Sequence, residues 1–156
     1  MSNVVSVTGG TKNQRRLAKE VAYWCITELM PRHSTLDIEI ILTKCLEEGA
    51  AGYCYALETE REFEVLIDKR IYPNNRNEFI LTVCHEMVHV MQTAKGLLVD
   101  RVRPSKYGYR QLWKCARTNT MKDYSKTPYS KRPWERQAYR MQNKLLKKYL
   151  EAEENS

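Results

Sequence analysis

Two histidines and a glutamate stand at a spacing that could bind and use a metal ion. The segment reads His85-Glu86-Met87-Val88-His89. On a helix, residues four apart lie one turn apart on the same face, so both imidazoles could bind one ion. Glu86 would lie beside that face, where a carboxylate can take a proton from water without ligating the metal. This H-E-x-x-H pattern predicts peptide hydrolysis, with Glu86 as catalytic base and one Zn²⁺ per chain.

A catalytic zinc site takes three protein ligands, so a third ligand must lie elsewhere in the chain. His33 is the only other histidine, and it lies in a predicted turn. Glu135 is the better candidate, because it directly follows a Pro-Trp pair at 133–134, and proline can open a helix. The alternative role of Glu135 is that of a favourable acidic residue in a first helical turn. We predict that His85, His89 and Glu135 are the metal ligands.

The segment around Glu135 resembles that of a known family. Residues 129–138 read YSKRPWERQA, which is similar to the Y-x-x-x-P-W-E-x-x-A segment of small gluzincin-like zinc metallopeptidases. These include SprT-like proteins and the minigluzincins, several of them encoded by phages. The resemblance implies that one helix supplies His85, His89 and the base, and that Glu135 on a later helix supplies the third ligand. It also implies a peptide or protein substrate, and a host cytoplasm if the chain is encoded by a phage.

Tyrosines near the predicted site could stabilise the oxyanion formed during hydrolysis. A tyrosine hydroxyl aimed at the developing negative charge does the work of an oxyanion hole. Of the ten tyrosines, Tyr129 and Tyr139 are the first catalytic candidates, and Tyr109 and Tyr124 are further ones. Packing around the last helix is the alternative role for them.

A predicted strand beginning at Gly52-Tyr53-Cys54-Tyr55 could bind the substrate. In gluzincin-like folds an extended peptide adds to such a sheet edge through main-chain hydrogen bonds. An ordinary second strand of the sheet explains the same residues equally well.

Hydrophobic periodicity predicts the elements that must position these residues. Helices are expected at 11–30, at 77–95 and from Pro133 onward. Alternation predicts strands at 36–43, 53–57 and 63–67, the last two joined as a hairpin. Thr11 and Gln14 have capping-box spacing, and Gly96 suits a helix C-terminus. The stretch 97–132 is expected to be irregular, apart from a short helix at 112–117. The order predicts a single zincin-like α+β domain over 1–156, with a three-stranded, mainly antiparallel or mixed sheet.

Composition bounds the class of protein. The 156 residues fit one hydrophobic core, and 42% hydrophobic with 29% charged residues excludes a disordered chain. The apolar runs are too short for a membrane span and no secretory signal is present, so a cytoplasmic location without a membrane partner is expected. The five cysteines lack C-x-x-C spacing, which favours reduced thiols over disulfides or a zinc ribbon.

The formal net charge of +7 could favour an anionic partner. A solvated helix face explains it better than a dedicated nucleic-acid site, because no nucleic-acid-binding motif accompanies the charge. Two alternative functions stay open: a zinc-stabilised module that binds nucleic acid or protein without cleaving, and a peptidase acting on DNA-bound proteins, as the SprT resemblance allows. The basic residues beyond position 100 include Arg101, Arg103, Lys106, Arg110, Lys131, Arg132, Lys144, Lys147 and Lys148.

Overall fold

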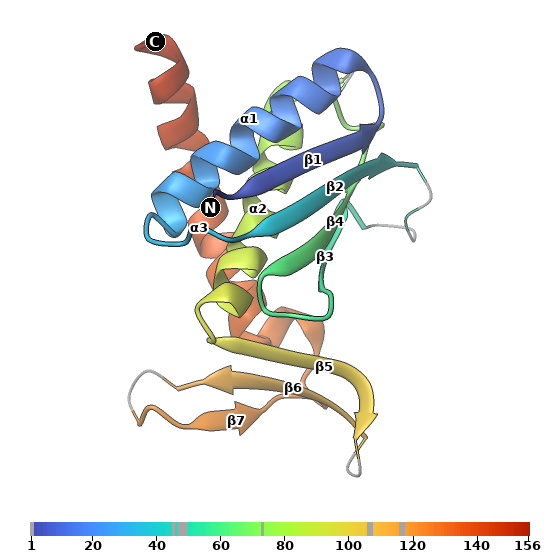
Figure 1. Ribbon diagram of the computed structural model, residues 1–156, viewed down its shortest axis with the longest axis vertical. Helices are drawn as coiled ribbons and strands as arrows, with labels where there is room; N and C mark the ends of the chain where they lie inside the picture. Colours follow the sequence, from blue (N-terminus) through green and yellow to red (C-terminus); the bar gives the residue numbers. More distant parts are fainter. Residues whose placement is uncertain (1, 45, 47–49, 73, 106–107, 116–117) are drawn as a thin grey trace.

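A computed structural model shows an α+β molecule with two sheets, which confirms the predicted fold class (Figure 1). A four-stranded sheet packs against helices, and a smaller three-stranded sheet lies at one end of the molecule. Cys45 and Lys106 lie outside the described residues, as do the side chains of Arg101, Arg103 and Arg110. The structure describes residues 2–44, 46, 50–72, 74–99, 111–115 and 118–156, and the backbone alone of 100–105 and 108–110.

The larger sheet contains the three predicted strands and one more, in the order β1-β2-β4-β3. Its strands are β1 (Val4–Gly9), β2 (Asp37–Thr43), β3 (Gly52–Ala56) and β4 (Glu62–Asp68). β2 pairs in parallel with both β1 and β4, whereas β3 and β4 form the expected antiparallel hairpin. β3 is therefore an edge strand of a mixed sheet.

The first strand, β1, was not predicted. Its inward side chains are Val5, which is buried, and Val7, which packs against the core, while Ser6 and Thr8 alternate with them. That alternation was a signal for a strand. β1 is short and its partner β2 lies beyond a whole helix, so the local pattern alone does not say where it pairs.

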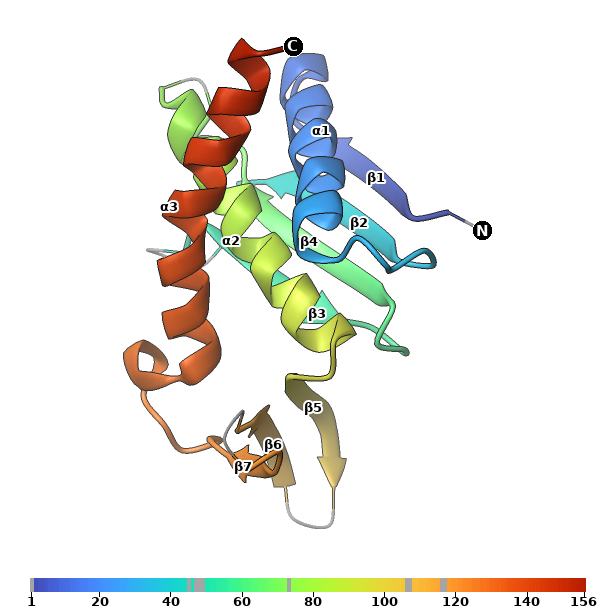
Figure 2. The same ribbon diagram turned by 90° about the vertical axis from the view of Figure 1, so that its left-hand side faces the viewer.

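Three helices cover one face of the larger sheet. They are α1 (Lys12–Leu29), α2 (Arg76–Ala94) and α3 (Pro133–Glu154). α1 and α2 pack between the sheet and α3, and α3 lies along the outer side of α2 (Figure 2). Thr11 and Gln14 form the predicted capping box at the start of α1.

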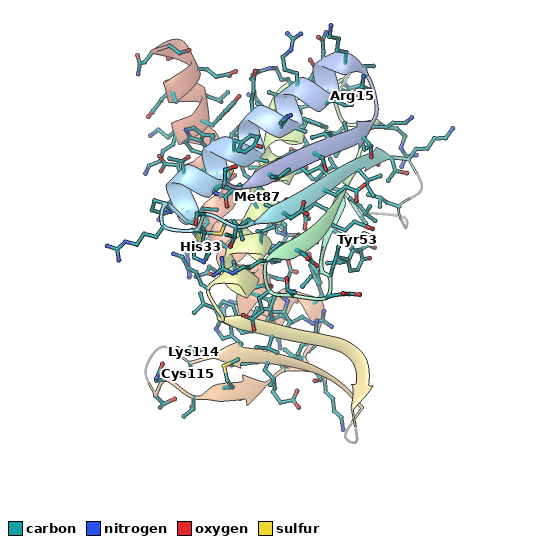
Figure 3. All side chains as sticks on the ribbon, in the orientation of Figure 1. Arg15, His33, Tyr53, Met87, Lys114 and Cys115 are labelled. Atoms are coloured by element: carbon teal, nitrogen blue, oxygen red, sulfur yellow. The ribbon has the colours of Figure 1, made fainter. Side chains whose placement is uncertain are left out.

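The core lies between α1, α2 and the larger sheet. Met87 of α2 is fully buried in it (Figure 3). The opposite side of α2 is left for the predicted site, as the amphipathic pattern requires. The buried apolar side chains that α2, β2 and β4 contribute include Ile38, Ile40, Val65, Ile67, Phe79, Val83 and Val90.

The other face of the larger sheet carries acidic residues and is not covered by any described helix (Figure 2). In the parallel pairing of β2 with β4, Asp37 stands beside Glu62 and Glu39 stands beside Glu64. Like charges at neighbouring positions repel each other. We refer to these four residues as the acidic face.

The stretch after α2 is not irregular, and this prediction was wrong. β5 (Leu98–Ser105), β6 (Gly108–Lys114) and β7 (Met121–Asp123) form an antiparallel sheet. The short helix expected at 112–117 is also wrong, because 112–114 belong to β6. β5, β6 and β7 are held together by main-chain pairing with one another. Because few of their residues are apolar, the sequence of this segment shows no regular hydrophobic alternation. Among the described residues, no helix is long and apolar enough to cross a bilayer.

Candidate metal centre

His85 and His89 lie side by side on α2, one turn apart. Their ring centroids are 4.9 Å apart and their Nε2 atoms are 3.2 Å apart. Both side chains belong to buried residues. The helix therefore brings two imidazole nitrogens to one point, as the four-residue spacing predicts.

Glu135 completes the group from the first turn of α3. Its Oε1 atom lies 3.2 Å from Nε2 of His85 and 3.1 Å from Nε2 of His89. Tetrahedral ligands about 2.0–2.1 Å from a zinc ion stand roughly 3.3–3.4 Å apart, so this spacing fits one ion. The buried group of His85, His89 and Glu135 could hold a metal ion. The structure thus brings the three predicted ligands together.

A glutamine accepts a hydrogen bond from the other ring nitrogen of each histidine. Nδ1 of His85 lies 2.8 Å from Oε1 of Gln142, and Nδ1 of His89 lies 2.8 Å from Oε1 of Gln92. An amide oxygen only accepts, so each Nδ1 carries a proton, and an imidazole that binds a metal in its neutral form would present the lone pair of Nε2. Sequence reasoning missed both roles. Gln142 lies two helical turns after Glu135, a spacing that could have pointed to it.

Gln92 also joins α2 to α3. It is fully buried, and its Nε2 donates to the main-chain oxygen of Trp134 at 3.0 Å and to Oε1 of Gln137 at 2.8 Å. These two donations fix the orientation of its amide. One side chain therefore positions His89 and, through Trp134, the start of the helix that carries Glu135.

In the metal-free site, Glu135 and His89 shift each other's pKa towards the charged form. Burial opposes ionisation of Glu135, but hydrogen bonds from His85 and His89 outweigh it and hold the pKa of that carboxyl below its usual range. Burial also disfavours a charged His89. The hydrogen bond to Glu135 and the negative charge of Glu86 outweigh that cost and raise the pKa of His89 to about 9. A cation at this point is favoured before any metal binds.

Glu86 lies next to the three ligands without joining them. It is 4% exposed, and burial raises the pKa of its carboxyl, although the charges of His89 and His85 oppose this. The side chain packs closely against β3. A Cβ added to Gly52 would lie 3.0 Å from Oε1 of Glu86 and 2.8 Å from the main-chain oxygen of Leu66. Only glycine fits there, so the strand and the carboxylate position each other.

A cavity of about 580 Å³ opens beside the metal ligands. β3 forms one wall, and the predicted substrate residues Gly52, Tyr53, Cys54 and Tyr55 all line it. The rings of Tyr53 and Tyr55 stack with centroids 6.0 Å apart. Glu86 and the metal ligands face the same space, so a bound molecule along β3 would pass the catalytic candidates.

The tyrosine candidates take different positions. Tyr129 donates its hydroxyl to Oε1 of Glu135 at 2.9 Å, so it holds the carboxylate ligand. The Tyr139 ring lies edgewise against His85 at 4.7 Å between centroids, half exposed in the cavity. Tyr124 packs against a tryptophan side chain. The side chain of Tyr109 lies outside the described residues.

His33 is not part of this group. It lies in the turn between α1 and β2 (Figure 3). Its main-chain oxygen accepts a hydrogen bond from Asn3. The described residues that could share one ion here are His85, His89 and Glu135.

Comparisons of the chain with protein-family models, with curated proteins and with solved structures find no match. The resemblance to gluzincins therefore stays a prediction.

Proposed function

We propose that the protein is a zinc-dependent metallopeptidase of the gluzincin type. The observation that carries this proposal is the convergence of three donor atoms, from His85, His89 and Glu135, beside the buried carboxyl of Glu86. Two imidazoles and one carboxylate are a recognised ligand set of catalytic zinc. A structural zinc site usually has four protein ligands and is closed. This group has three candidate ligands among the described residues, and it faces the cavity.

The side chains around the site divide the work of hydrolysis. Bound zinc would supply a Lewis acid and lower the pKa of a nearby water to about 7. Glu86 takes a proton from the attacking water and passes it to the leaving amine. Tyr129 and Tyr139 are both half exposed at the cavity and are the candidates to stabilise the oxyanion. In the metal-free site the hydroxyl of Tyr129 donates to Glu135. β3 holds an extended peptide across the cavity.

Metal content and turnover test this proposal together. The purified protein should contain one zinc per chain and cleave members of a quenched-fluorescent peptide library. Glu86→Gln should keep its zinc and lose at least about 100-fold in kcat, because general-base catalysis contributes that much. His89→Ala should lose zinc. The matched control is His33→Ala, which removes a histidine outside the group. Full turnover in Glu86→Gln, or full zinc content in His89→Ala, would contradict the proposal.

A second function has one observation in its favour. Basic side chains are exposed along α3, at Arg136, Arg140, Lys144 and Lys147. A zinc-stabilised module that binds nucleic acid, or a peptidase acting on DNA-bound proteins, would use such a surface. Mobility-shift assays across salt concentrations separate these functions from simple proteolysis. Salt-sensitive DNA binding together with Glu86-dependent cleavage supports the combined function, and binding without cleavage supports the module.

A further inference from the structure

Arg132 places a positive charge in the cavity beside the metal ligands. It is the residue just before α3, and its main-chain oxygen accepts hydrogen bonds from the main-chain nitrogens of Glu135 and Arg136, both at 3.1 Å. Its half-buried side chain lines the cavity. Among the described residues that line this cavity, Arg132 is the one arginine, and lysine does not occur.

The side chain of Arg132 is held in place by three contacts. Its Nε donates to the main-chain oxygen of Thr127 at 3.0 Å. The guanidinium carbon lies 5.9 Å from the ring centre of Trp134 and 6.0 Å from that of Tyr129. Cation–π contacts and one hydrogen bond limit its rotamers before any ligand arrives. A pre-ordered group loses less conformational entropy on binding.

The described carboxylates that line the cavity, those of Glu78, Glu86 and Glu135, form no ion pair with this arginine. Glu135 is engaged with two histidines and Tyr129, and Glu86 packs against β3. Within the part of the chain that the structure describes, no carboxylate lies at ion-pair distance from Arg132. The guanidinium thus retains donors on its terminal nitrogens, arranged as the fork that binds a carboxylate with two hydrogen bonds.

We propose that Arg132 selects substrates by binding a carboxylate of the peptide. The carboxylate belongs either to an aspartate or glutamate side chain or to the C-terminal residue. This inference rests on the proposed peptidase function, and it names the substrate class of that site. Arg132 would act as a substrate-binding residue, and the chemistry would stay with Glu86 and the metal ligands.

Matched peptides measure this selectivity. One pair differs by glutamate against glutamine, and a second pair by a C-terminal carboxylate against an amide. The parent should cleave the acidic member of one pair with the higher kcat/KM, and the pair that responds identifies the source of the carboxylate. In Arg132→Gln the ratio of kcat/KM for the acidic peptide to kcat/KM for its neutral partner should fall close to one. The expected loss of selectivity is about 10- to 100-fold, in line with a charge-assisted hydrogen bond. Arg132→Lys should recover part of it, because it keeps charge but loses the fork.

Arg136→Gln is the matched control, because it removes the same charge from an exposed position on α3. Its discrimination between the paired peptides should equal that of the parent. Zinc content and thermal unfolding of each variant show whether Arg132→Gln has damaged the fold. A parent that cleaves both members of each pair equally, or an Arg132→Gln variant that discriminates like the parent, overturns the inference.

Binding separates this inference from the proposed function. Calorimetric titration of the paired peptides into zinc-loaded Glu86→Gln protein requires no turnover. The parent could cleave nothing while acidic peptides still bind, with an affinity that Arg132→Gln lowers at least about tenfold. In that case the peptidase proposal fails and carboxylate recognition stands. If acidic and neutral peptides bind equally, or neither binds, carboxylate recognition is wrong whatever the parent cleaves.

Discussion

Each histidine of the candidate metal centre is oriented by a glutamine on the ring nitrogen that faces away from the ligand group. Carboxylates or main-chain oxygens often take this role in metal sites. Here the acceptors are the amides of Gln92 and Gln142. An amide fixes the tautomer without adding negative charge. The negative charges that act on His89 are those of Glu135 and Glu86.

Replacing Gln92 should weaken metal binding without touching a ligand. Gln92→Leu removes the acceptor for His89 Nδ1 and leaves the main-chain oxygen of Trp134 without this donor. We expect zinc affinity to fall about 10- to 100-fold and the free energy of unfolding to fall by about 1–3 kcal/mol. Competition with a chromophoric chelator measures the affinity. Gln92→Glu keeps an acceptor for His89 and should recover part of it; equal affinity in parent and Gln92→Leu would refute the orienting role.

The metal-free protein should lose stability as the solution becomes alkaline. The pKa of His89 rises from its usual 6.5 to about 9 in the folded state. Because the folded state binds this proton more tightly than the unfolded state, protonated His89 contributes to the free energy of unfolding. The contribution is complete below pH 6.5 and is lost as the pH rises through about 9. Denaturant unfolding of chelator-treated protein at pH 6 to 10 measures the change. His89→Gln should flatten this part of the profile; a parent whose stability rises over the same range would contradict the assignment.

At the scale of the elements, the close contact of β3 with α2 holds Glu86, the proposed catalytic base, in place. Gly52→Ala would drive a methyl group toward the main-chain oxygen of Leu66 and the carboxyl of Glu86. We expect kcat to fall by at least about tenfold, because a displaced base is costly, while zinc content stays at the parent level. Gly96→Ala is the control. Gly96 has φ +74 and an open surrounding, so it should lose about 1 kcal/mol of stability and keep its turnover.

The sequence predicts the elements whose signals are local. α1, α2 and α3 follow from periodicity with the capping pair Thr11 and Gln14 and with Pro133. The relative position of His85 and His89 is likewise local, because it follows from one turn of α2. The small sheet was missed because its strands are held by pairing rather than by a periodic apolar face. The two-turn spacing from Glu135 places Gln142 on the same side of α3. Its contact with His85, however, depends on how α3 packs on α2, across 57 residues of sequence.

At the scale of the whole molecule, the metal ligands meet only when α2 and α3 are packed together. Glu135 is 46 residues from His89 along the chain. An unfolded chain does not offer this three-ligand site, so a metal bound there would add to folding stability. Zinc at 1,000 times its dissociation constant contributes about 4 kcal/mol.

Removing the metal should therefore lower the melting temperature. For a chain of this size, a stabilisation of about 4 kcal/mol corresponds to a shift of roughly 8–16 °C. Differential scanning calorimetry before and after chelation, and after zinc is restored, measures the shift. His89→Ala should melt at the same temperature with and without zinc. A parent protein that melts at one temperature in all three states would exclude a metal that binds the folded chain.

The acidic face has a consequence for the molecule in an electric field. It lies on the side of the larger sheet opposite α3, whose exposed side bears basic residues (Figure 2). Among the described side chains, the acidic face and the basic residues of α3 thus lie on opposite sides of the molecule. This arrangement is expected to contribute an electric dipole along the direction from the sheet to α3. Such a dipole would turn the molecule before contact, so we expect an approaching polyanion or cation-exchange resin to meet the α3 side while the acidic face turns away.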